Sequence, residues 1–216
     1  MLRTGEGILH VNNHCNQEGL SSIFTTNVLG HHVLINELMP KLIPHDPNRS
    51  SRIIWTTSMS STANAFNPDD LTGMNVPMPY ESSKYVLEAA SMGLNNKYNK
   101  DGVYSLVGDP GTAVTNILTG ILPSWVWTLF LIPLFCLLRI IIPSNNLTPE
   151  RASESLIQLF EIEPSSLPTN TKLCSRTSIL NQTYTKEERM PVVGEEDDIL
   201  QKVTQLAYTV TKKYRE

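Results

Sequence analysis

The alternation of helical and strand-like segments is the feature of this chain that most constrains its fold. Apolar residues recur at helical spacing through residues 19–42, where Pro40 is expected to end the helix, and a short β-branched and aromatic run follows at 52–58. A second helical segment at 80–99 precedes a second short strand at 103–107. This order predicts an α/β fold with a parallel sheet.

Composition favours one folded domain and disfavours nucleic acid as a partner. The 216 residues are 40% hydrophobic and 18% charged, which is enough to bury one sizeable core. The formal charge of −4 supplies no basic footprint for DNA or RNA. Cys15, Cys136 and Cys174 lack paired spacing, and His10 and His14 lack a fourth ligand beside Cys15, so we expect a reduced chain without a disulfide framework or metal site.

Four polar residues and one turn-forming segment stand where a parallel sheet would bring them together. Tyr80 and Lys84, four residues apart, share one helical face, and a nearby ammonium lowers the pKa of a phenol from about 10, which makes it a usable proton donor. Ser58 ends the first strand, at the edge where ligands bind in such sheets. Asn27 lies within an apolar helix and needs a hydrogen-bond partner, and residues 110–112 end the second strand.

This ordered set resembles the short-chain dehydrogenase/reductase family, whose pattern is N-x-x-G, a Ser after a strand, Y-x-x-x-K and then P-G. The similarity runs from about Gly19 to Phe160, and the segments that carry it are 26–31, 54–58, 80–85, 110–113 and 120–123. Within the family the chain is most similar to members that reduce steroid ketones in sterol biosynthesis. The resemblance implies the C-terminal portion of a Rossmann-like, doubly wound parallel sheet whose first strands are missing.

The resemblance also implies a role for each site residue. Tyr80 would donate the proton to a steroid ketone oxygen held by Ser58, and Lys84 would lower the Tyr80 pKa and bind the nicotinamide ribose. Asn27 would hold a water that links Lys84 to solvent. The cofactor would be NADP(H), which supplies the hydride. Besides Tyr80 and Lys84, the residues expected to border it are Pro110, Gly111 and Thr112.

Parts of the family pattern are absent. The glycine-rich turn that receives the pyrophosphate is missing, and Gly5-Glu6-Gly7 has too few preceding residues to follow a strand. The Asn-Ala-Gly segment and the residue that selects NAD or NADP are also missing. We therefore expect an exposed face on helix 19–42, an exposed edge on strand 52–58, dependence on a partner for folding, and weak dinucleotide binding. Asp109 stands where the most similar members have a small uncharged residue.

The segment after residue 110 is unusually apolar. It carries no charged side chain as far as residue 138, and 121–138 would form a helix about 27 Å long, marginal for a bilayer core of roughly 30 Å. A membrane-embedded helix or hairpin, an interfacial substrate cap and a buried core helix all remain open. We divide the chain into a catalytic part (1–115), this apolar segment (116–145), and C-terminal helices with a tail (146–216).

That C-terminal part is expected to hold two helices. The first spans 150–162 and is capped by Thr148 or Asn146, and the second is an amphipathic surface helix after the acidic run 195–198.

Two functional classes remain open for the chain. The first is NADP(H)-dependent reduction of a steroid ketone at the endoplasmic reticulum membrane, with the catalytic part facing the cytosol and a homo-oligomer or other sterol-synthesis enzymes as partners. The alternative is an inactive truncated paralogue or fragment that acts as a membrane-associated partner of sterol-synthesis enzymes. No secretory signal precedes the sequons at Asn48, Asn146 and Asn181, which formally permit N-glycosylation.

Overall fold

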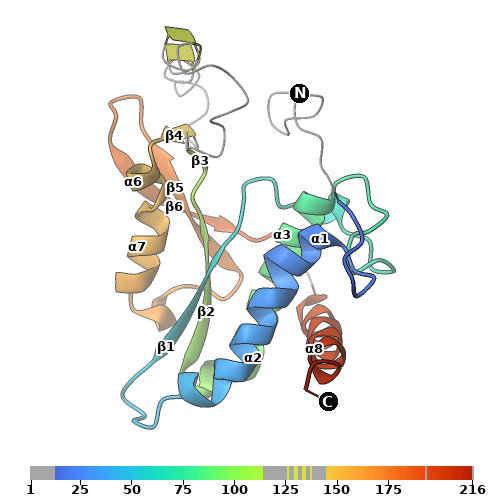
Figure 1. Ribbon diagram of the computed structural model, residues 1–216. Helices are drawn as coiled ribbons and strands as arrows, with labels where there is room; N and C mark the ends of the chain where they lie inside the picture. Colours follow the sequence, from blue (N-terminus) through green and yellow to red (C-terminus); the bar gives the residue numbers. More distant parts are fainter. Residues whose placement is uncertain are drawn as a thin grey trace.

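A four-stranded sheet in the order β1-β2-β5-β6 carries helices on both faces (Figure 1). The computed structural model describes residues 13–113, 126, 129–130, 133–134, 137, 145–192 and 194–215. The strands are β1 (Ser51–Thr56), β2 (Val103–Asp109), β5 (Thr171–Thr177) and β6 (Thr183–Arg189). Strands β1, β2 and β5 are parallel and β6 is antiparallel to β5, so the predicted parallel-dominated α/β architecture is confirmed.

The expected helix 19–42 is continuous but not uniform. It consists of α1 (Ser22–Phe24), a π-helical turn at Thr25–Leu29 and α2 (Gly30–Leu42). Asn27 lies within the π-helical turn. Pro40 does not end α2, contrary to the sequence prediction, because it lies so close to the last turn that the missing backbone donor removes little of the remaining helix.

Helix α3 (Pro79–Tyr98) is the most deeply buried element. Every residue from 82 to 95 is buried, because α3 lies between β2 and the C-terminal helix α8 (Glu196–Lys212). The two helices approach so closely at Gly93 that a Cβ there would lie 2.7 Å from the carbonyl oxygen of Glu196. The predicted C-terminal amphipathic helix is thus present, and its inner face covers α3.

The opposite face of the sheet is covered by α6 (Pro149–Ala152) and α7 (Glu154–Glu161). The sequence predicted one helix over 150–162, whereas Ser153 separates two, and Thr148 caps the first by accepting a hydrogen bond from the Arg151 N–H (3.5 Å). At Gly108, a Cβ would lie 2.6 Å from Leu156 Cδ2, so a larger residue there would force the Leu156 side chain of α7 to shift.

The hairpin of β5 and β6 was not expected within the C-terminal part, yet it completes the sheet that begins in residues 1–115. Strand β6 reads Thr-Tyr-Thr-Lys-Glu-Glu-Arg and lies at the edge, so it carries little of the apolar signal by which buried strands are predicted. Smaller elements are the 3₁₀ turns Ala63–Ala65, Asn99–Asp101 and Pro164–Ser166, and a two-stranded sheet of β3 (Thr112–Ala113) and β4 (Asn145–Leu147).

The other edge of the main sheet is open among the described residues, because β1 pairs only with β2 there. On the neighbouring helix α2, Leu34 and Leu38 remain 55% and 45% exposed. Both observations match the exposed helix face and strand edge predicted from the sequence. No helix in the described ranges is long and apolar enough to cross a bilayer, and most of the apolar segment 116–145 lies outside those ranges.

Candidate functional site

Three of the four predicted catalytic side chains meet beyond the carboxyl end of β1. Ser58 follows β1 by two residues, and Tyr80 lies in the first turn of α3. Ser58 Oγ lies 3.0 Å from Ser60 Oγ and near the Tyr80 phenol, and Lys84 Nζ lies 5.5 Å from the centroid of the Tyr80 ring. The i, i+4 spacing therefore brings the phenol and the ammonium to one side of α3.

The fourth residue, Asn27, supports the start of α3. Its Nδ2 donates a hydrogen bond to Ser83 Oγ (2.9 Å), and Ser83 Oγ donates to the carbonyl oxygen of Tyr80 (2.7 Å). The expectation that this helical amide has a hydrogen-bond partner is confirmed. Asn27 and Lys84 both line a groove beside β1, and this groove separates the two side chains.

Lys84 is buried and holds its ammonium against β1. Its Nζ donates to the carbonyl oxygen of Thr56 (3.0 Å), and burial lowers the pKa of the amine, although the carboxylate of Glu88 opposes this shift. An ammonium has three N–H donors. One is used by Thr56, which leaves donors available to a ligand in the groove.

The pKa of Tyr80 is raised above its usual value of 10, opposite to the direction predicted from the sequence. Burial is the largest cause, and the nearby Ser58 hydroxyl offsets it only in part. The negative charges of Glu81 and Asp109 raise the pKa further. Lys84 is not among the groups that lower the Tyr80 pKa; its Nζ donates to Thr56 and lies 5.5 Å from the centroid of the Tyr80 ring.

The turn after β2 lies beside the Ser58 strand end. The backbone N–H of Thr57 donates to the carbonyl oxygen of Gly108 (2.9 Å), which keeps the two strand ends together. Gly111 has a φ of 65°, a conformation that favours glycine, and Pro110 precedes it. Thr112 is exposed at the start of β3. The turn therefore lies beside the end of β1, which Ser58 follows.

A groove of about 330 Å³ runs between α2 and the free edge of β1. Its walls are mostly apolar, with Leu34 and Trp55 on opposite sides, and Asn27 and Lys84 provide its polar groups. These residues suit the nicotinamide and ribose end of a dinucleotide, since an ammonium and an amide can bind hydroxyl groups. No glycine-rich turn between a strand and a helix occurs in the part of the chain that the structure describes, and Gly5-Glu6-Gly7 lies outside it.

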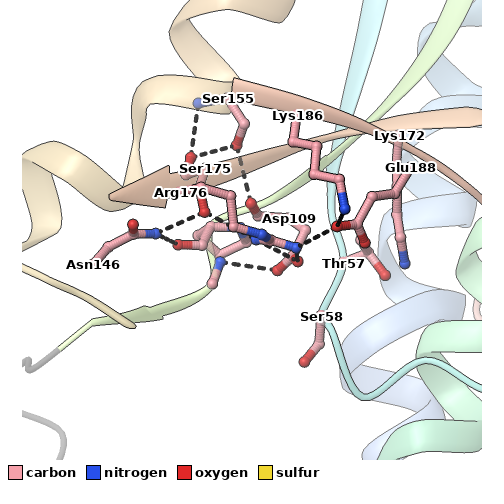
Figure 2. Close-up of polar contacts among 12 residues, drawn as sticks. Thr57, Ser58, Asp109, Asn146, Ser155, Lys172, Ser175, Arg176, Lys186 and Glu188 are labelled. Atoms are coloured by element: carbon pink, nitrogen blue, oxygen red, sulfur yellow. Dashed lines mark hydrogen bonds and ion pairs between the residues drawn. The ribbon is translucent and has the colours of Figure 1, made fainter. Parts of the chain in front are cut away.

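Two buried ion pairs were not predicted from the sequence. Lys172 Nζ lies 2.7 Å from Glu88 Oε1, and the Arg176 guanidinium lies 3.3 Å from Asp109 Oδ2 (Figure 2). The sequence did contain a signal for the second pair. Asp109 ends an apolar strand, and a carboxylate buried at such a position requires a cation. The cations lie 67 and 84 residues further along the chain, so spacing alone does not identify them.

The structure also shows the surroundings of the metal-ligating residue types and of the three N-glycosylation sequons. Within the described ranges, no three His, Cys, Asp or Glu side chains group as metal ligands; His10 and Cys136 lie outside them. The Asn146 side chain is fully buried and its amide is hydrogen-bonded, which is incompatible with a glycan at that sequon in the folded chain. Asn48 and Asn181 are exposed.

Comparison with known proteins identifies relatives of the whole chain. It is 38% identical over 215 residues to the 3-keto-steroid reductase/17-beta-hydroxysteroid dehydrogenase 7 of Homo sapiens and 37% identical to that of Rattus norvegicus. Over 74 residues it is 35% identical to the 3-keto-steroid reductase erg27 of Aspergillus fumigatus. The first two alignments include all of this chain but only 61% and 63% of the relatives. No family model matches the chain.

A solved structure supports the fold independently. The crystal structure of an uncharacterized protein from Mycobacterium paratuberculosis matches 91% of this chain and 62% of its own length, with a TM-score of 0.58 and 19% sequence identity. The sheet and its covering helices have the Rossmann-like arrangement that the sequence predicts. The chain is similar to the 3-keto-steroid reductases, which agrees with its resemblance to the short-chain dehydrogenase/reductase family.

Proposed function

We propose that this chain carries out NADP(H)-dependent reduction of a steroid ketone, with Tyr80 as the proton donor. The observation that supports the proposal most directly is the meeting of Tyr80, Ser58 and Lys84 beside the turn that follows β2. The names of the relatives add the substrate class, a 3-keto steroid. Since the chain spans about three fifths of the length of the human and rat relatives, their whole activity enters here as part of the proposal.

Tyr80 holds its proton at neutral pH, because its pKa is raised above the usual value of 10. It therefore has a proton to give as negative charge develops on a carbonyl oxygen, although the raised pKa makes it a weaker acid than a free phenol. Ser58 would donate a hydrogen bond to the same oxygen. Lys84 does not lower the Tyr80 pKa in this structure, and its proposed part is to bind the cofactor ribose.

The residues for one end of the cofactor are present. NADP(H) supplies the hydride when bound. Lys84 would bind ribose hydroxyls in the groove beside β1, and Pro110, Gly111 and Thr112 would border the nicotinamide. The described residues offer no glycine-rich turn for the pyrophosphate, so we expect NADPH to bind the purified chain more weakly than micromolar. Saturable micromolar binding measured by fluorescence titration would contradict this expectation.

The proposed role of Tyr80 predicts a selective loss in Tyr80→Phe. We expect ketone reduction to fall at least about 100-fold, since general acid catalysis contributes that much, with the dissociation constant of NADPH within about threefold of wild type. The assay follows NADPH oxidation by the full chain with 3-keto and 17-keto steroids. Tyr208→Phe, on the exposed face of α8, is the matched control and should retain full activity. Equal activity in Tyr80→Phe would remove Tyr80 from the proton transfer.

We also propose that the apolar segment attaches the chain to the endoplasmic reticulum membrane, from which a sterol could enter the site. The described side chains in the segment include four large exposed apolar ones, Leu129, Phe130, Leu134 and Leu137. Flotation of the full chain with phosphatidylcholine vesicles tests this, and a chain that stays at the bottom of the gradient contradicts it. Vesicle binding without any ketone reduction would favour the alternative function, a catalytically inactive partner of sterol-synthesis enzymes.

A further inference from the structure

Two buried side chains hold the Pro110–Gly111 turn from opposite sides. Asp109 Oδ1 accepts a hydrogen bond from the backbone N–H of Gly111 (2.9 Å), and Asn146 Nδ2 donates to the carbonyl oxygen of Pro110 (2.6 Å). Asn146 is itself fixed, because Nδ2 also donates to the carbonyl oxygen of Ser175 (3.0 Å) and Oδ1 accepts from the Thr177 hydroxyl (2.8 Å). The turn is thus attached to β4 and β5 as well as to β2.

Arg176 provides the charge that keeps the Asp109 carboxylate in place. Both Nη atoms of Arg176 lie 3.3 Å from Asp109 Oδ2, and both side chains are buried, with 6% and 1% of each residue exposed. Arg176 Nη2 also donates to Glu188 Oε1 (3.1 Å), which lies 3.3 Å from Lys186 Nζ. Figure 2 shows Arg176 between the two carboxylates, so the four charges alternate in sign and sum to zero.

The location of this cluster connects it to the candidate site. Asp109 is the last residue of β2, and its negative charge acts on the Tyr80 phenol. A carboxylate there with no cation would be buried without a partner, which is unfavourable enough to make it leave its position or take up a proton. Either change removes the strong charged acceptor that Gly111 now has.

We propose that Arg176 is a positioning residue: through Asp109, and together with Asn146, it holds the Pro110–Gly111 turn in the geometry that borders the cofactor and the ketone. The consequence for catalysis rests on the proposed function, whereas the hold on the turn does not. The cluster also accounts for the acidic residue that departs from the family pattern, since Arg176 neutralises it.

Hydrogen–deuterium exchange of the full chain, resolved at single amides by NMR, tests the hold on the turn. In Arg176→Met we expect the Gly111 amide to exchange at least about tenfold faster, because its acceptor loses the charge that fixes it, while the β2 amide of Val107 is unchanged. The double variant Asp109→Asn with Arg176→Met keeps an oxygen acceptor at Oδ1 and has no buried charge, so it should restore protection to within about threefold. Lys186→Met, at the exposed end of the cluster, is the control and should leave Gly111 protected.

Several outcomes would overturn the inference. One is an unchanged Gly111 amide in Arg176→Met, and another is a faster exchange that is equal at Gly111 and Val107 and is not rescued by the double variant. If Arg176→Met does not fold, Arg176→Gln replaces it. Glutamine keeps hydrogen-bond donors for Asp109 but not the positive charge, so the same local acceleration is expected, and its absence counts against the proposal.

A kinetic measurement separates this inference from the proposed function. If the wild-type chain reduces ketones, Arg176→Met should raise the KM for NADPH about tenfold, and the double variant should recover it. An unchanged KM would overturn the link between the turn and the cofactor. If the wild-type chain reduces no ketone, the proposed function fails, and the Gly111 exchange rates still decide whether Arg176 positions the turn.

Discussion

Helices α2 and α3 are both next to the site, but they differ in how completely the rest of the chain covers them. Helix α3 is enclosed between β2 and α8, and Ile199 and Val203 of α8 are fully buried in the same core. Helix α2 contributes Ile35 and Met39 to the same core but leaves Leu34 exposed at the groove. We infer that the α3 side carries most of the stability, and that the α2 side, with the open edge of β1, is where ligands enter.

The ion pair between Glu88 of α3 and Lys172 of β5 should contribute more to stability than any other contact that we propose to change. Glu88 is fully buried, where Oε1 accepts hydrogen bonds from Lys172 Nζ and the Thr57 hydroxyl, both at 2.7 Å. Glu88→Ala leaves Lys172 buried without its carboxylate, so we expect a loss of about 3–5 kcal/mol in the free energy of unfolding. Urea denaturation followed by circular dichroism measures it.

The control for this prediction is Glu187→Ala, which removes an exposed carboxylate from β6 and should change stability by less than about 0.5 kcal/mol. Replacing both partners, as in Glu88→Leu with Lys172→Met, should recover most of the loss because no unpaired charge remains. If Glu88→Ala is as stable as the control, the α3 side is less important to stability than the comparison implies.

The next largest effect is a pH dependence at the contact between α2 and α8. His32 is fully buried, and burial, followed by the charge of Lys97, lowers its pKa to about 4. Thr204 Oγ1 donates to the carbonyl oxygen of Leu200, so it accepts from His32 Nε2 (2.9 Å), and Nδ1 has no hydrogen-bond partner among the described residues. Protonation would therefore place a charged N–H at Nδ1 with nothing to accept it.

The sign of the effect follows from the depressed pKa. An unfolded histidine titrates near 6.5, so between that pH and about 4 the unfolded chain binds a proton that the folded chain does not. Stability should fall as the pH drops through this window, by about 3 kcal/mol when the titration is complete. Urea midpoints at pH 7 and 4.5 measure the fall. His32→Gln should lessen it and His31→Gln, at the exposed neighbour, should not; identical profiles would show that His32 does not titrate in this way.

The parts of the structure that sequence predicted are those with a local signal. Strands β1 and β2 and helix α3 lie within two residues of their predicted bounds, because apolar periodicity is a property of neighbouring residues. The grouping of Ser58, Tyr80 and Lys84 followed from strand ends and helical spacing in the same way.

Features that depend on distant residues were not predicted. The polar strand β6 pairs with β5 along its whole length, but its own residues give no indication of burial. Arg176 reaches Asp109 only because β2 and β5 are neighbours in the sheet. The direction of the Tyr80 pKa shift depends first on burial, which the spacing of Tyr80 and Lys84 does not report.

A smaller difference in stability is expected between one apolar side chain on α8 and one on α2. Val203→Ala removes two methyl groups that α8 buries over α3, and we expect a loss of about 2 kcal/mol, whereas Leu34→Ala removes a side chain that is 55% exposed and should lose less than about 1 kcal/mol. Urea denaturation of both variants under identical conditions measures the difference. If Leu34→Ala loses as much as Val203→Ala, the α2 face is covered in solution, and the groove beside β1 is then not open to a ligand.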